Sequence, residues 1–258
     1  MTRTRMAKIQ TTKRATPEAI ARDVKAWLRK HRDPKRAAFL RKYFKETDKV
    51  DFFGISTPLV RDYEKSLWER FRGTWTLADA VRLCDLMLPD KYHEMKSIAV
   101  IVLLRFQKEF GSDLFGKIKS WLEKDACNSW AAVDILCPDA LGVLYVRYPE
   151  LVERVKSWAD HPNRWVKRGS AVGFIKTARR GLCLDAAYDV AERLFIVPDD
   201  LIHKATGWLL RESGKTDAAR LEAFLRRHGP RIPRTTLRYA VERFPEAKRK
   251  RLLQETKG

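Results

Sequence analysis

The chain has 258 residues, 45% of them hydrophobic, so it is long enough to bury a substantial apolar core. Its 53 lysines and arginines outnumber 33 aspartates and glutamates, which gives a formal net charge of +20. This balance predicts a polyanionic partner, and nucleic acid is favoured over a membrane surface because the basic termini lack the clustered aromatic residues of an amphipathic anchor. No apolar run is long enough to span a bilayer and no signal-peptide core is present, so we expect a cytoplasmic protein.

The cysteines and histidines show no pattern of metal ligation. They lack CxxC pairs, HExxH motifs and zinc-type spacing, and a disulfide framework is uncommon in so long a chain. We therefore expect reduced thiols, no metal and no cofactor. The residues concerned are Cys84, Cys127, Cys137, Cys183, His31, His93, His161, His203 and His228.

The N-terminal segment 1–15 carries several cations, no acid and no apolar periodicity, which predicts a disordered basic arm. Order is expected from Thr16 and Pro17, an N-cap followed by proline at the first helical position. Similar helix starts recur at Asp33, Thr57 and Thr76, and apolar residues between them follow helical spacing. The segment 16–258 is predicted to form a single all-α domain of a dozen or more short helices.

Four segments that begin with a cation and continue with small or apolar residues recur along the chain. Their cations are Lys96, Arg168, Lys204 and Arg238, whose sequence numbers differ by 72 (twice 36), 36 and 34 from each to the next. A period in the mid-thirties with helix-turn-helix content is typical of an α-solenoid. One cation per repeat on the concave face would form a basic ladder that follows a phosphate backbone, although solvated helix positions would produce the same pattern.

The segment 128–138 interrupts this ladder, because position 132, one such period after Lys96, falls between Trp130 and Asp134. We expect a short helix with Asn128 as N-cap, ended by Pro138. Trp130 and Asp134 would share one face, and no cation lies within four positions of the acid. A core tryptophan beside a solvated acid would give the same pattern, but a carboxylate in a basic cleft also suggests a catalytic group.

Four ordered segments resemble the AlkD-type DNA alkylation-repair glycosylases, a family built from HEAT-like repeats. They are Phe-Gly-Ile-Ser-Thr-Pro at 53–58, Trp-Ala-Ala-Val-Asp at 130–134, Asn-Arg-Trp-Val-Lys-Arg at 163–168 and Gly-Trp-Leu-Leu-Arg-Glu at 207–212. The resemblance covers about 17–245 of the chain. It implies a HEAT-like α-solenoid with a basic concave face that acts on alkylated double-stranded DNA, and we expect a monomer.

The resemblance also assigns residues. Asp134 matches the catalytic carboxylate, Trp130 and Trp208 match aromatic residues that contact the sugar, and Arg168 matches an arginine that contacts phosphate. Tyr43 matches a further aromatic residue on the DNA face, although its spacing to the following Gly-Ile pair differs.

The expected DNA contacts are completed by Arg211 in the last segment and by the ladder cations Lys96, Lys204 and Arg238. The chain departs from the family pattern at Ser56, Ser129 and Ala131, which bears on substrate range and DNA grip.

A lone carboxylate suits a particular leaving group. Cleavage of an N-glycosidic bond builds positive charge on the deoxyribose, which a fixed carboxylate stabilises while orienting water. Asp134 has no evident acid partner unless Asp125 or Asp139 folds in, so the base should already carry positive charge, as N3- and N7-alkylated purines do. No catalytic lysine for strand cleavage is evident, so we expect a monofunctional glycosylase. The alternatives are a non-catalytic module that binds unusual or branched DNA and a scaffold that binds an acidic peptide.

Overall fold

The computed structural model describes residues 15–46 and 48–256, so the predicted basic arm lies outside the described residues except for Ala15. Within the described ranges every regular element is a helix, apart from one isolated bridge between Asp51 and Tyr92. The α-helices are α1 (Pro17–Lys30), α2 (Pro34–Arg41), α3 (Thr57–Glu69), α4 (Leu77–Met87), α5 (His93–Arg105), α6 (Asp113–Glu123), α7 (Trp130–Arg147), α8 (Glu150–Lys156), α9 (Arg164–Val172), α10 (Ile175–Ala178), α11 (Leu184–Arg193), α12 (Asp200–Ser213), α13 (Ala218–His228), α14 (Arg234–Ala240) and α15 (Glu246–Glu255).

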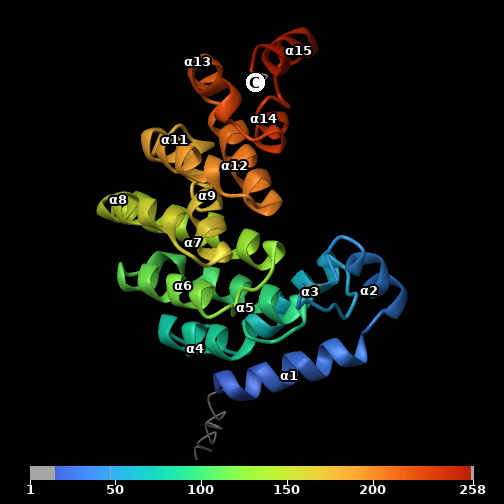
Figure 1. Ribbon diagram of the computed structural model, residues 1–258. Helices are drawn as coiled ribbons and strands as arrows, with labels where there is room; N and C mark the ends of the chain where they lie inside the picture. The colour runs from blue at the N-terminus through green and yellow to red at the C-terminus, as the bar shows by residue number, and fades with distance from the viewer. Residues whose placement is uncertain (1–14, 47, 257–258) are drawn as a thin grey trace, which may run out of the picture.

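From α4 onward, apart from the short α10, the helices alternate between two layers of a curved stack (Figure 1). The inner layer consists of α5, α7, α9, α12 and α14, and each of these helices contacts the next. They begin at His93, Trp130, Arg164, Asp200 and Arg234, so successive starting numbers differ by 37, 34, 36 and 34. The predicted α-solenoid and its period in the mid-thirties are therefore confirmed.

Local sequence signals set where the first helices begin. The Thr16 side chain accepts a hydrogen bond from the Ala19 amide at 3.2 Å, and Asp33 accepts one from Arg36 at 3.0 Å. Proline occupies the first position of both helices, where its missing N–H costs nothing. The predicted starts of α1 and α2 are confirmed.

The prediction for helix α7 was wrong at both ends. Ser129 is the N-cap, with its hydroxyl accepting from the Ala132 amide at 3.2 Å, whereas Asn128 donates its side-chain N–H to the Lys49 carbonyl. The helix also passes through Pro138 and continues to Arg147. Proline removes only the bond to the Asp134 carbonyl, and this loss is outweighed by the burial of the flanking apolar residues. Those fully buried residues are Leu136, Cys137, Ala140, Leu141 and Leu144.

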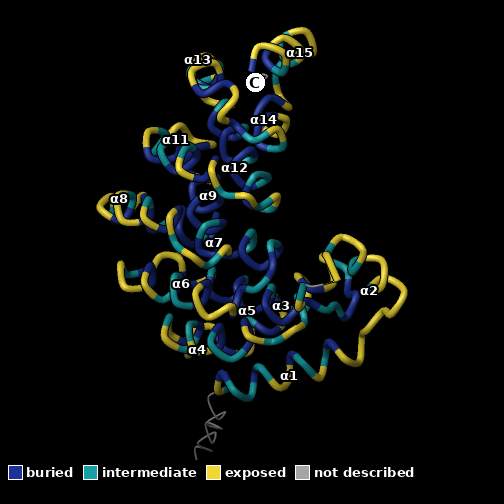
Figure 2. Tube along the Cα trace, in the orientation of Figure 1, coloured by how far each residue is buried: buried dark blue, intermediate teal, exposed yellow. Residues whose placement is uncertain are grey.

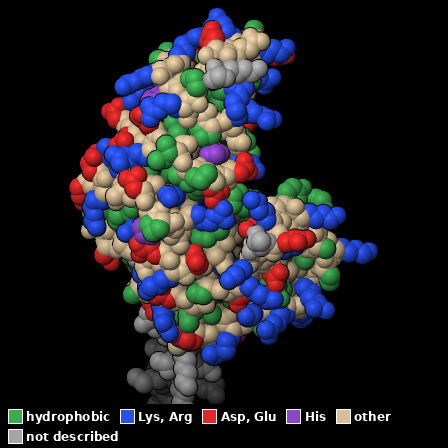
Figure 3. Space-filling model, viewed as in Figure 1, with side chains coloured by type: hydrophobic (Ala, Val, Ile, Leu, Met, Phe, Trp, Pro, Cys, Tyr) green, Lys and Arg blue, Asp and Glu red, His purple; other side chains and the backbone are tan. Residues whose placement is uncertain are grey.

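Helices α2 and α3, with the loop between them, form an N-terminal lobe that projects beside the concave side of the stack. Helix α2 has no buried residue, and Figure 2 shows it mostly exposed, in contrast with the buried inner layer. In Figure 1 this lobe and the inner C-terminal helices α12 and α14 face the same side, and the space-filling view in Figure 3 shows a hollow between them. No helix in the described ranges is long and apolar enough to cross a membrane.

Candidate functional site

A cavity of about 530 Å³ lies where the N-terminal lobe meets the inner layer. Its walls come from α2 with the loop that follows, and from one face each of α3, α5 and α7. On α5 the lining residues include His93, Ser97 and Ile101, and on α7 they include Trp130 and Asp134, spaced by four positions in each case. We call this the α5–α7 cavity.

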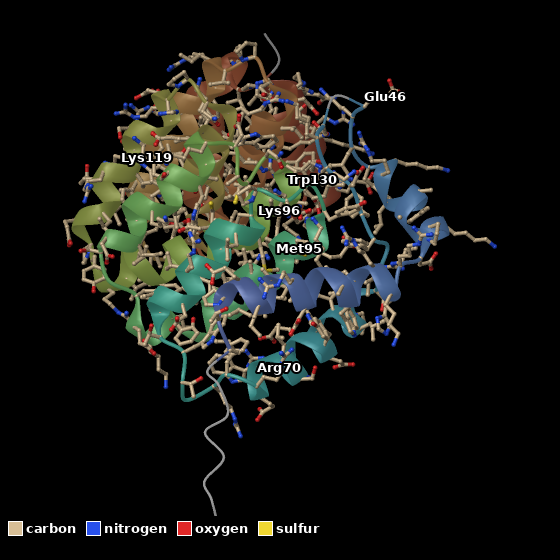
Figure 4. All side chains as sticks on the ribbon, turned by 90° about the horizontal axis from the view of Figure 1, so that it is seen from below. Glu46, Arg70, Met95, Lys96, Lys119 and Trp130 are labelled. Atoms are coloured by element: carbon tan, nitrogen blue, oxygen red, sulfur yellow. The ribbon has the colours of Figure 1, made fainter. Side chains whose placement is uncertain are left out.

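Trp130 and Asp134 share one face of α7, as predicted, and both line the cavity. The Asp134 side chain is 17% exposed. Trp130 is half-buried, and in Figure 4 it lies between the inner helices and the loop after α2, which carries Glu46. The acid and the aromatic ring are thus presented together to the concave side.

Arg168 supplies the cation that Asp134 lacks in its own helix. Its Nε donates to Asp134 Oδ1 at 2.8 Å and its Nη2 donates to Oδ2 at 2.7 Å, a bidentate pair. Its Nη1 donates to the Leu201 carbonyl at 2.5 Å, and the residue is 5% exposed. Arg168 was expected to present a free cation to phosphate; instead its three bonds hold Asp134 of α7 against α9 and α12.

Two effects oppose each other at the Asp134 carboxyl. Burial raises its pKa above the ordinary value, and the Arg168 guanidinium pulls the pKa back down. The bidentate geometry requires the ionised form, since both oxygens accept hydrogen bonds from the guanidinium.

Aromatic rings extend from Trp130 along the cavity wall. Trp130 stacks on Phe44 with ring centroids 4.9 Å apart and planes 11° apart, and Phe44 lies 5.2 Å from Phe52. Tyr43 also lines the cavity and is 63% exposed, in an edge contact with Phe39. The loop after α2 therefore supports the tryptophan that the family resemblance singled out.

Glu94 was not predicted, yet it fixes this loop. Its carboxylate accepts the backbone N–H groups of Phe53, Gly54 and Ile55 at 3.0, 2.8 and 3.3 Å. Gly54 has φ +84°, and an added Cβ would lie 2.1 Å from the Asp33 carbonyl oxygen. No local spacing signals this contact, because it joins residues about 40 positions apart.

Lys96 was expected on the concave face, and this prediction was wrong. The residue is 0% exposed, and its amine donates to the Leu88 carbonyl and, at 2.7 Å, to the Ala126 carbonyl. Burial lowers the pKa of Lys96 to about 8. Lys96 thus joins the ends of two outer helices, α4 and α6, and lies within the helical layers in Figure 4.

The remaining predicted contacts lie on the C-terminal repeats. Lys204 is partly exposed and pairs with Asp200 at 2.8 Å, while Arg238 is exposed with no ion pair among the described residues. Trp208 is half-buried, four positions after Lys204 on the same face of α12 and outside the walls of the α5–α7 cavity.

Arg211 was expected to contact DNA, but its side chain is 18% exposed and is paired with two carboxylates. One of them is Glu242, and the other is the adjacent Glu212 at 3.5 Å. Arg211 is therefore not a free cation in this state.

The surface around the opening is basic. Figure 3 shows Lys and Arg side chains on both sides of the hollow between the C-terminal repeats and the N-terminal lobe. On the lobe, Arg36 and Arg61 line the α5–α7 cavity and make no ion pair within the described ranges. No group of three or more potential metal ligands occurs in that part of the chain.

Comparison with known proteins identifies the family and the fold. Residues 24–244 match the family model of the DNA alkylation repair enzymes. A solved structure, "Predicted DNA alkylation repair enzyme from Enterococcus faecalis", has the same fold with a TM-score of 0.72 and 17% sequence identity, covering 83% of this chain and 97% of that one. A search of curated proteins found no significant match. The chain belongs to the AlkD-like family of DNA alkylation repair enzymes.

Proposed function

We propose that this enzyme is a monofunctional DNA glycosylase that releases cationic N3- or N7-alkylated purines from double-stranded DNA. The observation that supports this most directly is the Asp134 carboxylate, fixed by the Arg168 fork on a cavity wall beside Trp130. A carboxylate held in this way opposes positive charge without having to reorient during the reaction.

The chemistry needs an anion beside the sugar. Each Asp134 oxygen accepts one hydrogen bond from Arg168, which leaves each oxygen a further lone-pair site. As the base departs, positive charge builds on the deoxyribose, and the carboxylate stabilises that charge and orients the attacking water.

The other two acids that line the cavity are already engaged, because Asp139 pairs with Lys176 at 2.7 Å and Glu94 accepts three backbone N–H groups, so neither is a free general acid for a neutral leaving base. The titratable ring nearest to this role is His93, whose pKa is lowered to about 4, mainly by burial, so it is neutral near pH 7. A base that already carries positive charge leaves without protonation, which favours N3- and N7-alkylpurines as substrates.

Trp130 and Trp208 are proposed to place aromatic faces against the sugar, where they favour positive charge and exclude water. Trp130 is supported by its stack with Phe44. Lys204 and Arg238 are proposed to contact the phosphate backbone, together with the exposed Tyr43 on the opposite lobe.

The test is base release from methylated duplex DNA by Asp134→Asn, which keeps the side-chain shape and removes the charge. We expect release to be lost and DNA binding to be retained or strengthened. Asp139→Asn is a matched control, because Asp139 lies on the same helix, lines the same cavity and pairs with Lys176 at 2.7 Å. Undiminished release by Asp134→Asn would contradict the assignment.

The Asp134–Arg168 pair also favours a second candidate, a non-catalytic module that binds DNA. A buried ion pair can have a purely structural role, here to hold α7 against α9. Removal of one partner from such a pair costs about 3–5 kcal/mol of stability. This candidate predicts that Asp134→Asn mainly lowers the melting temperature and that the wild-type protein releases no base from methylated DNA.

A further inference from the structure

We propose that a hollow at the junction of α1, α2 and the start of α5 is a binding site for a nucleoside monophosphate unit. The unit is a free nucleotide or the unpaired end of a DNA strand, since both present one phosphate and one base. The inference stands on the charge of the hollow, its fixed backbone and two arginines without ion pairs. It does not depend on the proposed glycosylase chemistry, because no residue of α7, α9 or α12 lines this hollow.

The hollow lies on a different face of α2 from the α5–α7 cavity. Its volume is about 620 Å³, within the range of about 300–1,000 Å³ common for small-molecule sites. On α2, Pro34 and Ala37 line this hollow, whereas Arg36 and Leu40 line the α5–α7 cavity, and Phe52 lines both. The end of α1, which leads into α2 in Figure 1, forms a further wall. We call this site the α1–α2 hollow.

Four cations line the α1–α2 hollow, and no acid of the described ranges does. Two of these cations are lysines that pair with acids outside the lining. Lys25 pairs with Asp90 at 2.6 Å, and Lys91 pairs with Asp51 at 2.7 Å. A lysine ammonium has three donors, so each lysine keeps hydrogen-bonding capacity after its ion pair. The hollow therefore favours an anion over a neutral or cationic ligand.

The other two cations, Arg29 and Arg32, are the residues best suited to a phosphate. Both are exposed, and neither forms an ion pair or a side-chain hydrogen bond within the described part of the chain. They are three positions apart, near the end of α1 and in the turn that follows. A guanidinium group presents a planar fork of donors that matches a pair of phosphate oxygens. Two such groups beside an acid-free hollow can bind one phosphate together.

Backbone hydrogen bonds fix the loop segments that line the hollow. The Asp51 amide donates to the Lys91 carbonyl at 2.8 Å, and the His93 amide donates to the Asp51 carbonyl at 2.9 Å. At the start of α2, the Asp33 amide donates to the Phe53 carbonyl at 2.8 Å. A ligand therefore meets a preformed surface, and little free energy is lost to ordering when it binds.

Apolar groups complete the lining and suit a base or a sugar. Phe53 and Tyr92 stack with ring centroids 3.9 Å apart and planes 21° apart, and the Lys91 amine lies 5.0 Å from the centroid of the Tyr92 ring. Pro34 and Phe52 add further apolar surface. Inorganic phosphate would contact only the cations, whereas a nucleotide also covers the apolar surface, because every base has a π-face. The lining therefore indicates a nucleoside monophosphate and not a bare anion.

The first test is calorimetric or NMR titration of the full-length protein with deoxyadenosine monophosphate (dAMP). Inorganic phosphate and deoxyadenosine are the comparison ligands, since each supplies one part of the nucleotide. We expect dAMP to bind at least about tenfold more tightly than either, because its charge-assisted hydrogen bonds and its base contacts act together.

Two double variants then locate the site. Arg29→Gln/Arg32→Gln removes both unpaired guanidinium groups from exposed positions, so the fold should be retained, and dAMP binding should weaken at least about tenfold. The matched control is Arg22→Gln/Lys30→Gln, because both residues are exposed on α1 outside the lining and the net charge falls by the same amount. The dAMP affinity of the control should stay close to that of the wild type.

Two DNA ligands identify the source of the nucleotide. A closed dumbbell duplex has no strand end, whereas a hairpin with the same stem and a short single-stranded tail supplies one. If the site takes a strand end, the tail should strengthen wild-type binding, and Arg29→Gln/Arg32→Gln should abolish this gain. If the site takes only a free nucleotide, the tail should make no difference, and the variant should still lose dAMP binding.

The inference is overturned if Arg29→Gln/Arg32→Gln binds dAMP as the wild type does, or if the control double variant loses as much affinity. Equal affinities for inorganic phosphate and dAMP would also overturn it. Each of these outcomes leaves the proposed function standing, because base release from methylated DNA is measured separately. Binding of dAMP in the hollow with no base release by the wild type would remove the proposed function and leave the hollow as a nucleotide site.

Discussion

At the scale of single residues, Arg168 sets the state of the carboxylate proposed to act on the sugar. Its fork contacts both Asp134 oxygens, and the opposing effect of burial raises the pKa of that carboxyl. The two residues are 34 positions apart, in neighbouring inner helices. Orientation and ionisation of the acid thus depend on the same contact.

Removal of that guanidinium should alter the pH profile of base release. Burial already raises the Asp134 pKa, and without the cation, which lowers it, the pKa should rise further. Because the ionised acid is the active form, the acid limb of the profile should move to higher pH in Arg168→Met. The check is to measure single-turnover base release from pH 4 to 8. The spontaneous base loss measured with Asp134→Asn is subtracted at each pH.

Arg168→Lys is the control for this profile, since it keeps the charge and loses the bidentate geometry. Its acid limb should stay near that of the wild type, although its maximal rate should fall. An unmoved limb in Arg168→Met would show that Asp134 is not the titrating group.

The second residue-scale prediction concerns Lys96, whose pKa in the folded protein is about 8, below its ordinary value of 10.5. Between these pH values the unfolded chain binds more protons, so this residue makes stability rise with pH there. The rise is lost in Lys96→Met, which also leaves two buried carbonyls unpaired and should destabilise by about 2–4 kcal/mol. Urea unfolding at pH 7.5 and 10 measures both effects.

DNA affinity supplies an independent check on the role of Lys96. Because the side chain is 0% exposed, folded Lys96→Met should bind duplex DNA as the wild type does. A weaker affinity for DNA at a temperature where the variant is folded would show that Lys96 contacts a phosphate group.

At the scale of elements, the loop that enters α3 is held by contacts to two helices. Glu94 of α5 accepts its backbone N–H groups, and Gly54 passes close to the backbone of Asp33, the N-cap of α2, and of Ala37 within α2. This loop carries Phe52, so its position affects the aromatic wall of the α5–α7 cavity. The close approach to this backbone, together with the positive φ of Gly54, explains why glycine occupies this position of the segment 53–58.

Gly54→Ala should destabilise the protein through both backbone strain and a steric clash. A matched control is Gly73→Ala, because Gly73 has φ +80° and nothing within 4 Å of the added Cβ, whereas that Cβ at Gly54 meets the Asp33 carbonyl oxygen. We expect a loss of about 1 kcal/mol for Gly73→Ala and at least about 3 kcal/mol for Gly54→Ala. Thermal or urea unfolding measures both losses of stability. Equal losses for the two variants would mean that the close approach of Gly54 to the Asp33 carbonyl is unimportant.

At the scale of the whole molecule, the solenoid divides its cations between two tasks. Lys96 and Arg168, equivalent positions in the repeat, join neighbouring helices inside the protein, whereas Lys204 and Arg238 lie at the surface of the C-terminal repeats. The net charge of +20 supports general attraction to DNA, and only the accessible cations of the concave side can contact phosphates directly.

The double variant Lys204→Ala/Arg238→Ala tests this division. If each side chain neutralises one phosphate, the slope of log affinity against log salt should decrease in magnitude by about 1.8. Arg220→Ala/Arg227→Ala removes two cations from the outer helix α13 and should leave the slope near that of the wild type. Equal slopes for the two double variants would contradict a specific concave contact.

The sequence alone determined the features that depend on neighbouring residues. Thr16 with Pro17 and Asp33 with Pro34 start helices, and a four-residue spacing places Trp130 and Asp134 on one face. The repeat period followed from the same local logic, because each repeat is one pair of short helices. The expectation that Pro138 ends the helix was wrong, because burial of α7 on several sides outweighs the low helix propensity of proline.

Only the tertiary structure decided which polar groups are buried and with what partners. The Ala126 carbonyl bound by Lys96, the carboxylate bound by Arg168 and the Phe53 amide bound by Glu94 lie 30, 34 and 41 positions away in sequence. A charge enters the interior only when packing of the surrounding helices supplies hydrogen-bond partners that offset its desolvation. Those partners exist only once the repeats have stacked. The spacing of charges along the chain therefore could not distinguish a cation exposed on the concave face from a cation buried in a hydrogen bond between helices.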